Sequence, residues 1–181
     1  MNFFETTRAD TLNLLPSRPS FFARLALLSL LQVPSAFAAD AAGRVLWSSD
    51  GGSTMRIEGD TRTLEMQDNV KVTQGALVIK GDEAIFEYNA QTNDLRRVSV
   101  FGTPVHYEQQ LETGELVTGS SESMFLYRDA DGESVLEFRG SAVINSPESS
   151  MSCTAIIYLA DQELIREATG PCQGTLSSSD N

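Results

Sequence analysis

The stretch Met66-Gln67-Asp68-Asn69-Val70-Lys71-Val72-Thr73-Gln74-Gly75-Ala76-Leu77-Val78-Ile79-Lys80-Gly81-Asp82-Glu83-Ala84-Ile85-Phe86-Glu87-Tyr88 decides the fold. Apolar residues alternate with polar ones on both sides of Gln74-Gly75, as they do in half-buried strands. The alternation breaks at Gly81 and resumes through Ala84 and Phe86. The pattern predicts two strands joined at Gln74-Gly75 and a third that continues past a kink at Gly81.

The segments that follow resemble this stretch, which indicates a repeated β-unit. The interval from Gly81 to Gly119 is 38 residues, and the interval from Gly102 to Gly140 is also 38 residues. A period in this range, built of hairpins without helices, is typical of stacked β-units. Each unit needs a neighbour to bury its apolar face.

Aromatic residues extend the repeat. Phe86-x-Tyr88 recurs as Phe125-x-Tyr127 with a slip of one residue, and a third, shortened copy begins at Met151. The chain offers no convincing amphipathic helix after residue 38. We therefore expect an all-β fold of about a dozen short antiparallel strands in stacked repeats. A sandwich, a jelly roll and a single-file β-solenoid all fit the pattern.

Turn residues divide the strands. Asp68-Asn69 is typical of a tight turn, and Glu112–Gly114 and Asp129–Gly132 mark two more. Pro104 lacks the N–H that a ladder needs, so it should lie at an edge or in a bulge.

The first 38 residues are predicted to be a signal peptide. Arg18 and Arg24 precede the apolar run Leu25–Leu31, and Ala36-x-Ala38 fits cleavage after Ala38. The alternative is an uncleaved membrane anchor built on Phe21–Phe37. Beyond it we expect a flexible lead-in over 39–54, in which Val45-Leu46-Trp47 is the only apolar island. The β-domain should cover 55–176, followed by a disordered tail over 177–181.

The charge and the cysteines narrow the function. The chain has a net charge of −12, which argues against nucleic acid and against anionic membrane surfaces. In an exported protein the two cysteines, Cys153 and Cys172, suggest a disulfide. It would close a loop of about 20 residues and contribute roughly 3 kcal/mol to stability.

The sequence contains no convincing catalytic constellation. The single histidine, His106, is expected at the surface, and no nucleophile, metal-binding or phosphate-loop motif is present. The carboxylate pairs Asp82/Glu83 and Glu112/Glu115 lie at turns and kinks, where solvated acids are expected. We therefore expect neither enzymatic activity nor a cofactor or bound metal.

The apolar face that the alternation turns inward is the remaining candidate site. It is either a packed core or a partly filled groove that holds acyl chains, and the pattern alone fits both. The candidate lipid-facing residues are Ile57, Leu64, Val70, Val72, Leu77, Ile79, Phe86, Tyr88, Val100, Tyr107, Phe125, Tyr127, Phe138 and Val143.

Three motifs resemble the family of the periplasmic lipopolysaccharide-transport protein LptA, also described as OstA-like. The run from Asp68 to Ala84 is similar to its repeat "G-(D/N)-V-x-V-x-Q-G-x-x-x-(I/L)-x-(A/G)-D-x-(A/V)". Residues 101–109, with Gly102-Thr103-Pro104-Val105, and residues 114–119 are similar to two further segments. The resemblance covers roughly residues 55–170.

The resemblance implies a β-jelly-roll, an open V-shaped roll whose apolar groove carries the lipid A chains of lipopolysaccharide across the periplasm. It also implies head-to-tail pairing with further copies of the chain and with the homologous domains of LptC at the inner membrane and LptD at the outer membrane. Two features depart from the family: the first repeat is compressed, and Cys153 and Cys172 are outside its pattern. The alternatives are an anchored LptC-like component and an envelope β-sandwich that binds no lipid.

Overall fold

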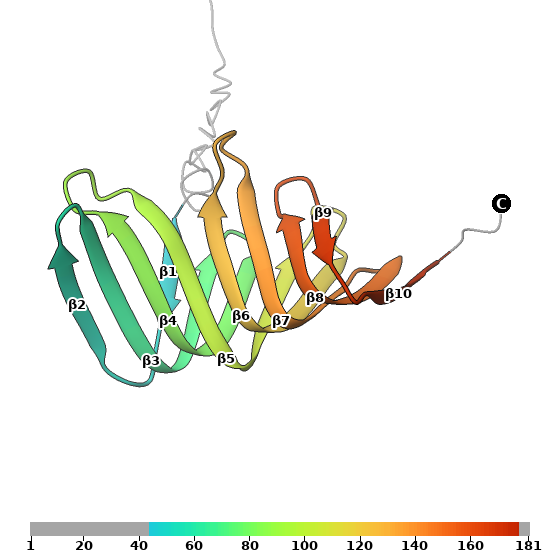
Figure 1. Cartoon of the computed structure of the whole chain (residues 1–181), viewed down its shortest axis with the longest axis horizontal. Coiled ribbons are helices and arrows are strands. Elements are labelled where there is room, and N and C mark those ends of the chain that lie inside the picture. The colour runs from blue at the N-terminus through green and yellow to red at the C-terminus, as the bar shows by residue number, and fades with distance from the viewer. Residues whose placement is uncertain (1–43, 178–181) are drawn as a thin grey trace, which may run out of the picture. The chain divides into compact units, whose positions relative to one another are not determined.

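The computed structural model describes residues 44–177, and within that range the chain forms ten strands and no helix. All ten strands belong to one antiparallel sheet (Figure 1). The segment therefore contains no helical stretch with the length and apolar character needed to cross a membrane. The strands are β1 Val45–Ser48, β2 Ser53–Glu58, β3 Thr61–Gln74, β4 Leu77–Asn89, β5 Leu95–Gln110, β6 Leu116–Arg128, β7 Ser134–Asn145, β8 Ser149–Leu159, β9 Leu164–Thr169 and β10 Gln173–Leu176.

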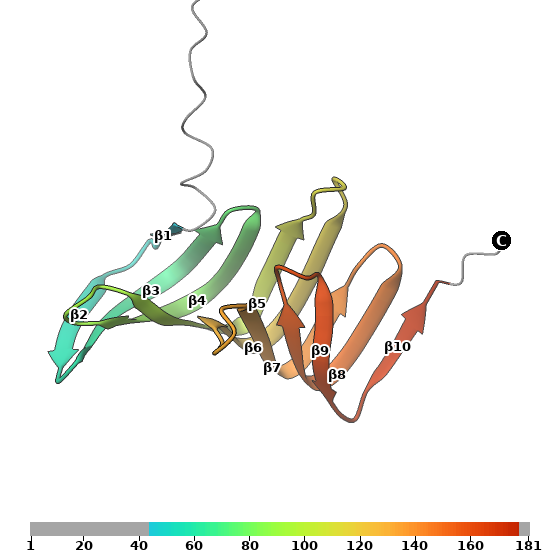
Figure 2. The same ribbon diagram turned by 90° about the horizontal axis from the view of Figure 1, so that it is seen from above.

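Consecutive hairpins place β3 to β8 side by side in chain order, and two short strands complete each end of the sheet (Figure 2). At the N-terminal end, β2 pairs with the first half of β3 and β1 pairs with its second half. At the C-terminal end, β10 pairs with the first half of β8 and β9 pairs with its second half. Each end of the sheet therefore presents two edge strands.

Bulges in neighbouring strands line up across the sheet, and we call this line the crease. Register shifts fall at equivalent places in each pairing from β3/β4 to β7/β8. Since a bulge bends its strand, the crease divides the sheet into two halves. Leaf A comprises residues 61–67, 83–89, 95–101, 123–128, 134–139 and 155–159 with β2 and β9; leaf B comprises 70–74, 77–81, 105–110, 116–121, 142–145 and 149–153 with β1 and β10.

The residues at the crease suit its backbone. Asp68 and Asn69 have φ of 65° and 50°, and Gly140 has φ of 78°. Asn, Asp and Gly tolerate this left-handed region best. Asp82 strengthens the bend, since its Oδ2 accepts hydrogen bonds from the backbone N (3.2 Å) and Oγ1 (3.4 Å) of Thr103. The crease is thus specified locally, by residues that do not belong to the hydrophobic core.

The crease also shifts the phase of the alternation. In β4 the buried residues are Leu77 and Ile79 before the crease, and Ala84 and Phe86 after it. Because the bulge changes the count by one, the inward-facing residues of β4 are odd-numbered on leaf B and even-numbered on leaf A. The same change occurs in β5, β6 and β8.

The apolar faces of the two leaves pack against each other and form one core. The Tyr107 ring on leaf B contacts Phe138 and Tyr158 on leaf A, with ring centroids 5.5 Å and 6.2 Å apart. Burying a side chain of this size contributes about 1.5–3 kcal/mol. Residues that are paired from strand to strand form layers of this core. One such layer of leaf A consists of Leu64, Phe86, Val98, Leu126, Leu136 and Tyr158.

Several expectations from the sequence hold, and three need correction. The all-β class, the Gln74-Gly75 turn, the kink at Gly81 and the bulge at Pro104 are confirmed. Asp68-Asn69 is a bulge inside β3 and not a turn. Six of the ten strands span 11 to 16 residues, so the strands are fewer and longer than expected.

The third correction concerns the flexible lead-in expected over 39–54. Val45–Ser48 forms β1 and pairs with Lys71–Gln74 of β3, because the apolar island supplies a short strand for a free edge. The linker after β1 is also held at the crease: Asp50 N donates to Asp68 O at 2.8 Å, and Asn69 Nδ2 donates to Asp50 Oδ2 at 2.9 Å. The predicted signal peptide and most of the predicted tail lie outside the described residues.

The expected disulfide is present. Cys153 lies on β8 beside the crease, is nearly fully buried, and is bonded to Cys172 in the link between β9 and β10. Thr154 Oγ1 donates to Gly170 O at 3.0 Å in the same place. The link between the two C-terminal edge strands is thus fixed to the crease by a covalent bond.

Replacing Gly119 tests the contact between the leaves. A Cβ at this position would lie 2.6 Å from Phe138 Cε1 and 2.9 Å from Val143 O. We expect Gly119→Ala to destabilise the fold by about 1–3 kcal/mol, as overpacked cores do. The measurement is the midpoint of urea unfolding. Gly52→Ala is the matched control, since a Cβ there meets nothing within 4 Å; equal midpoints for the two variants would contradict the close packing of the leaves.

Candidate functional site

The inner face of the roll contains most of the residues predicted to face a lipid. Nine of the fourteen are at most 8% exposed and belong to the core. A tenth, Tyr88, is half-buried at the rim, where it stacks on Phe86 and lies beneath Arg62. The nine core residues are Leu64, Val70, Val72, Leu77, Ile79, Phe86, Val100, Tyr107 and Phe138.

Phe125, Tyr127 and Val143 face outward, which corrects the prediction for these three residues. Their neighbours in sequence, such as Met124 and Ile144, are the buried ones. For Phe125 and Tyr127 the prediction failed because the slip of one residue relative to Phe86-x-Tyr88 exchanges the two faces of β6, as any slip of one residue does. In β7 two residues lie at the crease, so the even-numbered residues face inward on both leaves and Val143 faces outward.

Arginine side chains cover the outward-facing aromatic rings. The Arg97 guanidinium lies 4.3 Å from the Phe125 ring centroid and 5.7 Å from that of Tyr127, and Arg139 lies 4.9 Å from Phe125. Cation–π contacts of this kind contribute about 0.5–1 kcal/mol at exposed sites. The outer aromatic residues of leaf A therefore have a structural partner of their own.

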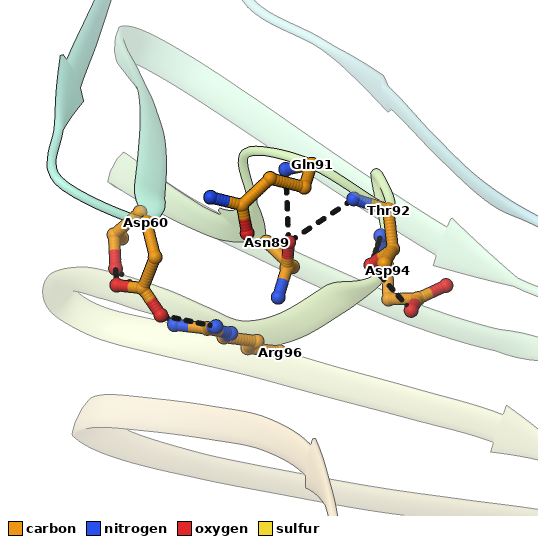
Figure 3. Close-up of polar contacts among 7 residues, drawn as sticks. Asp60, Asn89, Gln91, Thr92, Asp94 and Arg96 are labelled. Carbon is orange, nitrogen blue, oxygen red and sulfur yellow. Dashed lines mark hydrogen bonds and ion pairs between the residues drawn. The ribbon is translucent and has the colours of Figure 1, made fainter.

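Polar contacts secure the adjoining end of leaf A (Figure 3). Arg96 Nη2 donates to Asp60 Oδ2 at 2.8 Å, which joins the β2–β3 turn to β5. This ion pair holds the pKa of the Asp60 carboxyl below its usual value. Asn89 Oδ1 accepts from the backbone N of Gln91 and Thr92 at 2.9 Å and 3.0 Å, closing the β4–β5 loop.

The N-terminal end of the inner face is open to solvent. Trp47 on β1 and Met55 and Ile57 on β2 are 45%, 57% and 65% exposed. By register, Trp47 is level with Val72 and Met55 with Leu64, so all three continue the apolar inner face. Ile57 faces inward as predicted, but it lies on an edge strand, since within the described part of the chain β2 pairs with β3 alone.

The C-terminal end contains a cavity of about 440 Å³ between the leaves, here called the C-terminal cavity. Its volume is in the range of small-molecule sites, about 300–1,000 Å³. The sequence analysis missed it, because its walls come from strand ends and from three loops distant in sequence. Its lining comprises Leu111, Glu115, Val117, Ile144, Ser146, Pro147, Glu148, Ser149, Tyr158, Glu163, Leu164 and Ile165.

Two buried tyrosines lie at the C-terminal half of the core. The Tyr107 hydroxyl donates to Gln109 Oε1, and Gln109 Nε2 donates to Ala160 O at 3.3 Å. The Tyr158 hydroxyl is buried and has no hydrogen-bond partner among residues 44–177. Burial raises the pKa of Tyr107, and burial together with the nearby Glu163 charge raises the pKa of Tyr158 to about 12.

The residues considered as catalytic candidates have a structural role or lie exposed at the surface. Asp82 supports the crease, and His106 is exposed on β5. Over residues 44–177, no group of three or more His, Cys, Asp and Glu side chains is arranged to hold a metal ion. What the arrangement offers is apolar surface: a packed centre, an open N-terminal end and a C-terminal cavity.

Comparison with known proteins places this architecture in context. Residues 52–164 match the family model described as LptA/(LptD N-terminal domain) LPS transport protein. The chain is 28% identical over 135 residues to the lipopolysaccharide export system protein LptA of Haemophilus influenzae, covering 70% of this chain and 77% of that protein.

The fold is similar to a crystal structure of LptH, the LptA-homologous periplasmic component of the lipopolysaccharide transport device of Pseudomonas aeruginosa. The TM-score is 0.59 at 12% identity, covering 77% of this chain and 99% of the other. The open sheet of ten strands is thus the β-jelly-roll of that structure.

The buried tyrosines predict a loss of stability at high pH. Above the ordinary tyrosine pKa of 10.0, the unfolded chain releases protons that Tyr107 and Tyr158 retain in the fold. The unfolded state then binds fewer protons, so the free energy of unfolding falls as the pH rises from about 10 towards 12. Urea midpoints across this range should fall less steeply for Tyr158→Phe than for the wild type; parallel curves would show that Tyr158 ionises as freely in the fold as in the unfolded chain.

Proposed function

Because the chain belongs to the LptA/LptD N-terminal domain family of lipopolysaccharide-transport proteins, we propose that it carries lipopolysaccharide through the periplasm. The acyl chains of the lipid lie against the inner faces of the two leaves. The observation that carries this proposal is the apolar inner face itself, which continues to solvent at the N-terminal end and into a cavity at the C-terminal end. A carrier of this kind needs no catalytic residue.

The energetics suit a carrier that binds lipopolysaccharide through its acyl chains. Burial of an acyl chain is worth about 0.8 kcal/mol for each CH₂ group. The net charge of −12 opposes attraction to the phosphate groups of the lipid. Affinity therefore rests on apolar contact, and the phosphates remain in water. Such a complex can pass its lipid to the next apolar surface without breaking strong ion pairs.

The position of the chains follows from the packing. Residues at the centre, such as Phe86 and Ile79, have no exposed surface and leave no room for a ligand while the leaves are closed. Chains enter at the two ends and reach the centre only when the leaves separate about the crease. The candidate lipid-facing residues thus form two groups, one accessible in the closed roll and one exposed by opening.

The edge strands provide the contacts for a bridge between membranes. β1 and β2 at one end, and β9 and β10 at the other, lie at the two ends of the strand order. Such edges are templates for strand addition. In this proposal they pair head-to-tail with other copies of the chain and with the related domains of LptC and LptD. Cleavage after Ala38 releases the protein into the periplasm, in contrast to an anchored LptC-like component.

Photo-crosslinking tests the position of the lipid. A benzophenone side chain introduced at Tyr88 or Ile165, both half-buried on the inner face, should form lipopolysaccharide adducts in cells. The matched controls are Tyr127 and Ile157, which are half-buried on the outer face of the same leaf. Adducts of equal yield on both faces, or only on the outer face, would reject the groove. A lack of adducts at all four positions would favour an envelope protein that binds no lipid.

Assembly is tested at the N-terminal edge. The average mass of the purified protein should rise with concentration in analytical ultracentrifugation. Ile57→Asp should suppress this rise, because it places a charge on the exposed apolar inner face of β2. Thr54→Asp adds the same charge to the outer face of the same strand and should change the mass little. An equal effect of both variants would mean that the inner face does not contribute to the contact.

A further inference from the structure

Arg62 is an arginine on the apolar inner face of the roll. It lies near the tip of β3 on leaf A, between Ile57 of β2 and Tyr88 of β4 in the strand register. Its position two residues before the buried Leu64 places it on the inward side of the strand. The guanidinium carbon lies 5.4 Å from the centroid of the Tyr88 ring, so the side chain lies over this face.

The guanidinium of Arg62 keeps one nitrogen atom free for a ligand. Nη2 donates to the amide Oδ1 of Asn93, and Nε is buried without a hydrogen-bond partner among the described residues. Nη1 is not buried, and no residue in the described part of the chain accepts a hydrogen bond from it. Its two N–H groups are therefore available to a ligand that approaches from solvent.

No carboxylate in the described part of the chain forms an ion pair with Arg62. Asp60, two residues earlier, is paired with Arg96, and Asp94 accepts a hydrogen bond within the β4–β5 loop. Arg62 therefore keeps an uncompensated positive charge, although the net charge of the chain is −12.

Open apolar surface adjoins this charge. Met55 and Ile57 on β2 face inward and are 57% and 65% exposed, and Ile57 is paired with Arg62. Glu65 of β3 and Glu87 of β4 occupy the alternate positions and face outward. The N-terminal end of the inner face thus combines exposed apolar side chains with one positive charge. This combination is complementary to a lipid that has an acyl chain and an anionic head group.

The chemistry of the guanidinium favours a phosphate as that anionic group. Its planar set of N–H donors matches the oxygen atoms of a phosphate. The acidic surface of the chain repels phosphates elsewhere. Because Nη1 of Arg62 is open to solvent, a phosphate bound there stays hydrated, and exposed ion pairs contribute little affinity. Such a contact orients the lipid, whereas the apolar surface supplies most of the affinity.

We propose that Arg62 binds a phosphate group on the head of the carried lipid, while an acyl chain of the same molecule lies along Met55 and Ile57. This inference rests on the proposed lipid-carrier function. It adds the point at which the head group is held at the N-terminal end and the side of the roll from which the chain enters. Arg62 is a specificity-determining residue in this arrangement, because it distinguishes phosphorylated from neutral amphiphiles.

Two octyl amphiphiles test this contact in the purified protein, at concentrations below micelle formation. Octyl phosphate has a charged head and octyl glucoside a neutral one. Titrations followed through the methyl NMR signals of Met55 and Ile57 should show both amphiphiles at the N-terminal end. In Arg62→Gln the affinity for octyl phosphate should fall about two- to fivefold, the range of an exposed ion pair, and its dependence on salt should weaken. The affinity for octyl glucoside should stay unchanged.

Arg97→Gln is the matched control. Arg97 also covers aromatic rings and forms no ion pair among the described residues, but it lies on the outer face of the same leaf. Its replacement should leave both affinities unchanged. An equal fall for octyl phosphate in Arg97→Gln and Arg62→Gln would overturn the site. An equal fall for both amphiphiles in Arg62→Gln, or no fall for either, would overturn the charge contact.

Inorganic phosphate separates a lipid head-group site from a site for free anions. It should displace octyl phosphate only at a much higher concentration, because it has no chain to bind the apolar surface; displacement at equal concentration would contradict the proposal. If neither amphiphile shifts the Met55 and Ile57 signals, the N-terminal end holds no chain and the proposal fails. Crosslinking at Ile165, at the other end of the strand order, then still decides separately whether the protein carries lipopolysaccharide.

Discussion

The line of bulges across the sheet is the constraint on which the rest of the structure depends. A flat sheet of these strands would expose its apolar face, and only the bend at the crease brings leaf A onto leaf B. The bend needs left-handed backbone at Asp68, Asn69 and Gly140 and a close approach at Gly81, where a Cβ would lie 2.6 Å from Val100 Cγ1. In the proposed lipid carrier, deeper entry of a ligand would require the leaves to part, so the crease would also govern access to the interior.

The strand pattern was readable from sequence because alternation and glycine turns are local signals. The class and the Gln74-Gly75 hairpin were predicted in this way. The disulfide was predicted from the two cysteines of a chain that was expected to be exported. The inward face was predicted correctly on both sides of the Gln74-Gly75 turn, as at Val70 and Ile79. It failed at Phe125 and Tyr127, because a bulge changes the phase of the alternation and the sequence does not state which residue is the extra one.

The C-terminal cavity could not be predicted, since it depends on how far apart the ends of β6, β7, β8 and β9 and three loops lie in space. Nothing in the sequence distinguishes the hydroxyl of Tyr158 from that of Tyr107. Only the packing shows that, among the residues the structure describes, the Tyr107 hydroxyl has a hydrogen-bond partner and the Tyr158 hydroxyl has none. Local patterns thus predicted which residues are apolar and inward, whereas the unfilled space and the unpaired atom required the tertiary structure.

The two ends of the sheet are built alike but braced differently. In both, the link between the edge strands crosses the crease; hydrogen bonds from Asp50 and Asn69 hold it at the N-terminal end, and the Cys153–Cys172 bond holds it at the C-terminal end. In the head-to-tail assembly proposed above, a strand that docks on β9 and β10 would meet an edge held by a covalent bond, whereas a strand that docks on β1 and β2 would meet an edge held by hydrogen bonds alone. Each joint of such a row would pair a more rigid edge with a less rigid one, so the two edges of a joint would differ in how far they can adapt to each other although every unit is identical.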